Sequence, residues 1–137
     1  MTLKEFINKA MFVPFKDNGR DYDGWDCWGL LRRGYRDVYN ISIHSYDRAY
    51  RSIRDTERIK ELVVEGKAKN WWEPVIFPRE GDTVVLYLEG RPIHVGLMLG
   101  DKKFMHTDEG VNTCIQKLSD FRVEGIYRYN EDNKLWL

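Results

Sequence analysis

The first part of the chain carries apolar residues at helical spacing. Thr2 and Glu5 have the T-x-x-E spacing of a capping box, in which each side chain bonds the backbone N–H of the other residue. The apolar stripe that follows ends before Pro14, a residue that interrupts helices. The pattern predicts a helix over residues 2–13, with an inner face formed by Leu3, Phe6, Ile7, Ala10 and Met11.

The same periodicity predicts two more helices. One begins at Cys27 and ends near Tyr39, and Gly34 lies near its apolar face, where a missing side chain lets a helix approach a sheet closely. The other is short, covers residues 56–64 and ends at Gly66, because glycine commonly terminates helices. Loops are predicted for residues 16–24 and for most of residues 40–54.

Beyond residue 82 the pattern changes from a helical period to the alternation typical of strands. Turn residues separate five short apolar runs, at residues 83–88, 93–99, 103–107, 111–117 and 124–129. Helices that precede a strand meander predict an α+β fold, in which N-terminal helices pack on a C-terminal antiparallel sheet of about five strands. The length predicts one domain over residues 1–137.

Charge and cysteine content narrow the classes of function. The chain has 22 basic and 22 acidic residues in mixed order, which argues against binding to nucleic acid or to a membrane surface. The N-terminal segment carries charges within its apolar run and lacks a signal-peptide core, so we expect synthesis in the cytoplasm and two free thiols, Cys27 and Cys114. Scattered histidines and the lack of a C-x-x-C motif predict neither a metal site nor a cofactor.

The stretch GWDCWGL, residues 24–30, contains the first candidate for chemistry. With Asp26 as N-cap, Cys27 falls in the first turn of a helix, where the dipole and free N–H groups favour negative charge. This position predicts a lowered thiol pKa, and the same N–H groups can bind an oxyanion. The alternative is a buried structural cysteine, so the decision depends on a nearby base.

Two histidines are candidates for that base. His94 begins one predicted strand and His106 ends the next. A two-residue loop between the strands would place the histidines on opposite faces. With a three-residue loop over residues 100–102, Leu99 pairs with Lys103 and the histidines become diagonal neighbours on one face, about 7–8 Å apart between backbones. That second register suits a base and a partner that orients it.

Three blocks of the sequence resemble the NlpC-type cell-wall peptidases, which are papain-like cysteine enzymes. The blocks are DGWDCWGL, GDTVVLYLEGRPIHVGLMLGDKKFMHT and VEGIYRY, and the resemblance covers about residues 3–129. It implies that Cys27 is the nucleophile, His94 the general base and acid, and His106 the orienting residue. The segment NWWEPV before GDTVVL is most similar to members from bacteriophage tails and prophages.

The sequence departs from this family at two positions near the site. Trp28 stands where the family usually has a serine that shapes the substrate pocket, and Phe15 where a tyrosine assists the oxyanion hole. Together with Asp26, these residues are candidates for substrate binding. Phenylalanine has no hydroxyl donor, and the loss of one donor from an oxyanion hole can cost about 2.7–4 kcal/mol.

The resemblance implies hydrolysis of a peptide or amide bond in peptidoglycan stem peptides, typically between D-glutamate and the following diamino acid. The reaction would pass through a thioester on Cys27. The implied partners are a peptidoglycan peptide and phage tail proteins, with action at the cell wall as part of a virion. Two alternatives are an amidase or acyltransferase for another acyl substrate, and a structural tail-assembly module with little or no turnover.

Overall fold

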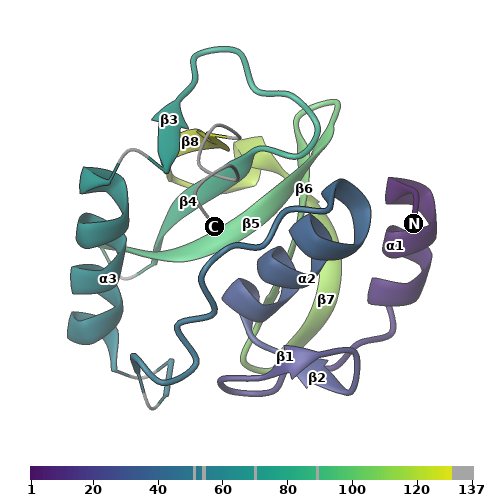
Figure 1. Ribbon diagram of the computed structural model, residues 1–137, viewed down its shortest axis with the longest axis horizontal. Coiled ribbons are helices and arrows are strands. Elements are labelled where there is room, and N and C mark those ends of the chain that lie inside the picture. The colour runs from purple at the N-terminus through teal and green to yellow at the C-terminus, as the bar shows by residue number, and fades with distance from the viewer. Residues whose placement is uncertain (51, 54, 70, 89, 131–137) are drawn as a thin grey trace.

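The helices of this protein pack against an antiparallel sheet, as the computed structural model shows (Figure 1). The structure describes residues 1–50, 52–53, 55–69, 71–88 and 90–130. In these ranges the elements are α1 (Leu3–Ala10), β1 (Arg20–Asp21), β2 (Gly24–Trp25), α2 (Cys27–Tyr39), α3 (Thr56–Ala68), β3 (Trp72–Pro74), β4 (Thr83–Leu88), β5 (Arg91–Gly100), β6 (Lys103–Asp108), β7 (Val111–Lys117), the 3₁₀ helix η1 (Leu118–Asp120) and β8 (Val123–Tyr129). The predicted α+β class is confirmed.

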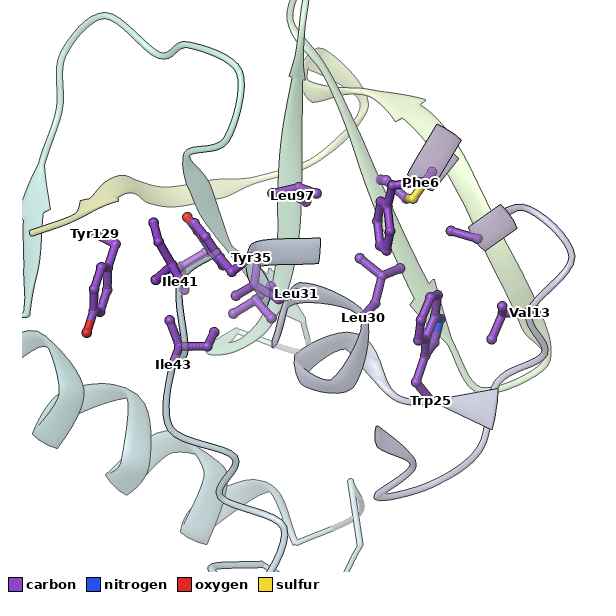
Figure 2. Close-up of a cluster of buried hydrophobic side chains, with 14 residues drawn as sticks. Phe6, Val13, Trp25, Leu30, Leu31, Tyr35, Ile41, Ile43, Leu97 and Tyr129 are labelled. Carbon is purple, nitrogen blue, oxygen red and sulfur yellow. The ribbon is translucent and has the colours of Figure 1, made fainter. Parts of the chain in front are cut away.

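The two N-terminal helices form as the sequence predicts. Thr2 and Glu5 make both hydrogen bonds of the capping box. Helix α1 ends at Ala10 and is therefore shorter than predicted. Helix α2 has the predicted bounds. Its C-cap residue is Asn40, whose left-handed conformation (φ 55°) closes the helix. Figure 2 shows core side chains of α1, α2 and the sheet, among them Phe6, Leu30, Leu31 and Leu97, gathered in one cluster.

Gly34 has the role in packing that its position predicts. A Cβ atom at this residue would lie 3.0 Å from Cδ2 of Leu97 on β5 and 3.3 Å from the ring of Phe6 on α1. A side chain would therefore push α2 away from both neighbours. The missing side chain holds the cysteine-bearing helix close to the strand that carries His94.

The structure corrects the prediction for α3. The helix does not stop at Gly66 but continues to Ala68, with Gly66 inside its last turns. Glycine costs about 1 kcal/mol relative to alanine within a helix, which tertiary contacts can offset. None of the residues of α3 is fully buried, although the helix packs beside β5.

The large sheet has six strands in the described residues, in the order β3-β8-β4-β5-β6-β7, one more than the approximate number predicted. The added edge strand β3 pairs Trp72 with Tyr129 of β8. Another strand pair, β1 and β2, lies partly in the predicted loop and pairs Arg20 with Trp25. Strands of two or three residues are too short to show alternation, so the sequence pattern did not indicate them.

The turn between β5 and β6 combines features of both predicted alternatives. Asp101 and Lys102 both have positive φ, 50° and 59°, and form a two-residue turn closed by the pair Gly100–Lys103. The register then shifts between Met98 and Gly100, so that the next strand pairs follow the register predicted for a three-residue loop. An extra residue at the bulge thus brings the two histidines to one face of the sheet.

Candidate active site

Cys27 is the first residue of α2 and lies at the edge of a pocket. Asp26 caps the helix, and its Oδ1 accepts a hydrogen bond of 2.9 Å from the backbone N–H of Gly29. The pocket has a volume of about 140 Å³, and its lining includes Cys27, His94 and all three candidate substrate-binding residues, Phe15, Asp26 and Trp28. The structure therefore brings the candidate nucleophile and the candidate base to one cavity.

The two histidines are in direct contact, as the second predicted register requires. Nε2 of His94 lies 2.7 Å from Nδ1 of His106, and both residues are buried, with exposed fractions of 3% and 4%. Nε2 of His106 lies 2.5 Å from Oε1 of Gln116. The sequence analysis missed Gln116. One signal could have identified it: Gln116 pairs with Phe104, and Phe104 lies two residues before His106 on the neighbouring strand.

Gln116 sets the direction of the hydrogen bonds in this chain. An amide oxygen can only accept a hydrogen bond. Nε2 of His106 therefore carries a proton and donates a hydrogen bond to Oε1 of Gln116. In a neutral His106 the other nitrogen, Nδ1, then accepts from Nε2–H of His94. This leaves Nδ1 of His94 with a lone pair, which is the form that a general base requires.

Replacement of Gln116 by leucine is expected to lower kcat about tenfold with little change in KM. The variant removes the acceptor that fixes the tautomer of His106, while His94 itself remains available for general base catalysis worth about 10²–10⁴-fold. Steady-state rates on a cleaved substrate, together with the pH profile of kcat, measure the effect. An unchanged kcat and pH profile would show that the tautomer does not depend on Gln116.

Cys27 lies beside β5, the strand that carries His94. The backbone N–H of Val95 hydrogen-bonds the Cys27 sulfur, and Val95 packs in the core cluster beneath α2. His94, one residue earlier, contacts His106, whose ring packs against Phe104 and Phe121. The β4–β5 register shifts beside the pair Leu86–His94, and His94 is part of the pocket lining.

The electrostatics correct the predicted pKa of the thiol. Burial, followed by the negative charge of Asp26, raises the pKa of Cys27 to about 12, against the lowering effect of the Val95 N–H. Burial and the neighbouring His106 lower the pKa of His94 to about 3. The helix N-terminus does not outweigh desolvation here. The resting site therefore holds a neutral thiol and a neutral imidazole.

The lowered pKa of His94 predicts a loss of stability in acid. The folded-state pKa, about 3, lies below the ordinary value of 6.5, so the unfolded state binds the proton first as the pH falls. The free energy of unfolding is expected to decrease between pH 6.5 and pH 3, by at most about 1.4 kcal/mol per pH unit from this group. Urea unfolding of wild type and His94→Gln measures it, and equal pH dependence of the two proteins would contradict it.

A buried network holds the start of α2, and the sequence analysis missed two of its members. The Asp26 side chain is 1% exposed; its Oδ1 accepts a hydrogen bond of 2.8 Å from Arg20. The hydroxyl of Tyr50 donates to Oδ2 of Asp26 and accepts from Arg20 over 2.8 Å. Arg20 also donates to the carbonyl of Ser45. The network ties the segment after α2 to the residue beside Cys27.

The two departures from the family pattern both line the pocket. Phe15 brings no hydroxyl, and the hydroxyl of Tyr50 in the same pocket is already engaged by Asp26 and Arg20. Trp28 donates from Nε1 to the carbonyl of His44 at 2.7 Å and contacts the ring of Trp72. Trp28 thus forms a wall of the pocket.

Metal ligands do not cluster in the described ranges, where no group of three or more His, Cys, Asp and Glu side chains is placed to hold an ion. Both cysteines are free thiols. No described helix has the length and apolar character needed to cross a membrane.

A helix that begins at a cysteine and packs on an antiparallel sheet with a histidine pair defines a papain-like fold with a candidate Cys-His site. The family comparison agrees with this class, because the NlpC/P60 family profile matches residues 13–124. The chain belongs to the NlpC/P60 family. No curated protein sequence matches it.

Solved structures of the family share the fold at low sequence identity. The NlpC/p60 domain of the peptidoglycan hydrolase SagA is 18% identical with a TM-score of 0.64, and the alignment covers 92% of this chain and 94% of that domain. For NlpC2 from Trichomonas vaginalis the values are 21% and 0.63, covering 92% of this chain and 44% of that protein. The P60 domain of an antigen from M. avium subspecies paratuberculosis is 17% identical, with a TM-score of 0.58 and 92% coverage of both chains.

Proposed function

We propose that this protein is a cysteine peptidase that hydrolyses an amide bond in peptidoglycan stem peptides. The observation that carries the proposal is the hydrogen-bonded pair His94–His106, with His94 in the same pocket as Cys27 at the start of α2. Membership of the NlpC/P60 family supports it, and the similar domain of SagA belongs to a peptidoglycan hydrolase.

The geometry supports a mechanism in two stages. Nδ1 of His94 takes the thiol proton as the Cys27 sulfur attacks the carbonyl carbon, and N–H groups at the start of α2 bind the oxyanion. The tetrahedral intermediate expels the amine, which receives the proton from His94, and a thioester remains on Cys27. Water, deprotonated by His94, then attacks the thioester; the acid leaves and the thiol is restored.

The finer assignments of this proposal rest on the sequence resemblance. The scissile bond is of the D-glutamyl–diamino acid type, as is typical of the family. The Trp-rich segment that contains Trp71 and Trp72 supports a protein of a phage tail or prophage, which acts at the cell wall as part of the virion with tail proteins as partners. In the structure Trp72 lies on β3 and contacts Trp28 of the pocket wall.

Digestion of defined muropeptides and whole peptidoglycan, followed by mass spectrometry, tests the proposal. The purified protein is expected to release products with the mass of water added at one amide bond, which identifies that bond. Intact substrate after digestion, with the protein shown to be folded by circular dichroism, would overturn the peptidase assignment and favour a structural tail module.

A further inference from the structure

Much of the pocket that holds Cys27 is lined by apolar side chains from outside the catalytic elements. Helix α3 contributes three of them, and the preceding segment and the β4–β5 hairpin contribute the others: Ile53, Ile59, Leu62, Val63, Leu88 and Ile93. In Figure 1, α3 stands on the far side of β5 from α1. The pocket thus extends from the candidate nucleophile to an apolar wall.

The apolar side chains of α3 that line the pocket are only partly buried. Its residues Ile59, Leu62 and Val63 line the pocket, and none of the residues of the helix is fully buried. A helix on a protein surface normally buries its apolar stripe against the core. Here part of that stripe borders an open cavity, so an apolar group that entered would bury surface that the protein itself does not cover.

Gly66 borders this cavity. It lies inside α3, where glycine costs about 1 kcal/mol relative to alanine, and it lines the pocket. A Cβ atom at Gly66 would have the hydroxyl oxygen of Tyr46, 4.0 Å away, as its nearest contact. Packing within the protein therefore does not require glycine at this position.

Of the charged residues described in the lining, Lys67 and Asp26 are paired with other side chains, and Asp108 accepts a hydrogen bond from the backbone N–H of Glu109. Lys67 donates to Glu124 over 2.5 Å, and its Nζ lies 5.6 Å from the centre of the Tyr127 ring. Asp26 is held by Arg20 and Tyr50. A carboxylate placed against the apolar wall would lose its hydration, and the cation of the described lining, Lys67, is already paired with Glu124.

We propose that the α3 side of the pocket is a subsite for an uncharged, apolar group in the acyl part of the substrate. The inference rests on the proposed function, because it takes Cys27 as the nucleophile that attacks the adjoining carbonyl. The apolar group enters between α3 and the β4–β5 hairpin, and charged groups of the substrate, stem-peptide carboxylates included, remain in solvent.

Acylation of Cys27 by 4-nitrophenyl esters of different chain length tests the subsite. The sulfur attacks the ester carbonyl, 4-nitrophenolate leaves, the thiol proton passes through His94 to solvent, and water later hydrolyses the thioester to the carboxylic acid. Stopped-flow absorbance and intact-protein mass measure acylation, with Cys27→Ala as background. The octanoate is expected to acylate Cys27 at least about tenfold faster than the acetate, because each buried CH₂ contributes favourably.

Two substitutions of Gly66 separate the subsite from the nucleophile. Gly66→Leu should remove the preference for octanoate over acetate, while the matched control Gly66→Ala should retain the preference. Both residues favour helix more than glycine does, and circular dichroism checks the fold. Equal rates for the two esters in wild type would overturn the subsite and leave the nucleophile intact. If neither ester labels Cys27, the proposed function fails as well.

Discussion

Replacement of Cys27 or His94 by alanine is expected to reduce substrate cleavage at least about 10⁴-fold. The first variant removes the nucleophile, and the second removes the base that must take the thiol proton. The second effect is large in this protein because burial raises the pKa of Cys27 to about 12, so very little thiolate exists near neutral pH without proton transfer. Rates of muropeptide cleavage at pH 7, followed by mass spectrometry, measure both losses.

Each of these variants has a matched control in the chain. Cys114→Ala removes the other free cysteine, and His44→Ala removes a histidine whose side chain is exposed and stacks on Tyr46 and Trp71. Both controls are expected to retain wild-type cleavage. If Cys27→Ala cleaved as fast as wild type, a nucleophile other than this cysteine would be responsible. Loss of activity in Cys114→Ala instead would place the chemistry on β7.

Asp26→Ala is expected to lower the free energy of unfolding by about 3–5 kcal/mol. The substitution removes the N-cap of α2 and leaves Arg20 and Tyr50 buried without their shared partner. Truncation of one partner of a buried ion pair costs far more than loss of a surface pair, because the remaining charge stays desolvated. Urea unfolding followed by circular dichroism measures the change.

A surface pair provides the control for this prediction. Asp23 bonds Lys16 over 3.5 Å, and both side chains are mostly exposed, so Asp23→Ala is expected to cost no more than about 1 kcal/mol. Tyr50→Phe, which removes one hydroxyl from the network, should fall between the two. Equal stability of the Asp26 and Asp23 variants would show that the network around Asp26 does not support the fold.

Local patterns in the sequence were sufficient for most of the fold. Helix α2 begins at Cys27 and ends at Tyr39 as predicted, and β4 and β7 have the predicted bounds, because apolar periodicity over such lengths is set by each segment's own contact with the core. The histidine pair also followed from the strand pattern once its register was chosen. The catalytic roles of Cys27, His94 and His106 remain predictions.

The sequence by itself determined the longer helices and strands and brought Cys27, His94 and His106 into one hypothesis. Only the tertiary structure decided their chemical state, because desolvation depends on everything packed around a group and reverses the pKa shift that the helix N-terminus predicts. The partners Gln116, Arg20 and Tyr50 likewise come from segments other than the helix and strands that carry these three residues. Periodicity records which face of a segment is buried, whereas a polar partner or an open cavity depends on how separate segments meet in space.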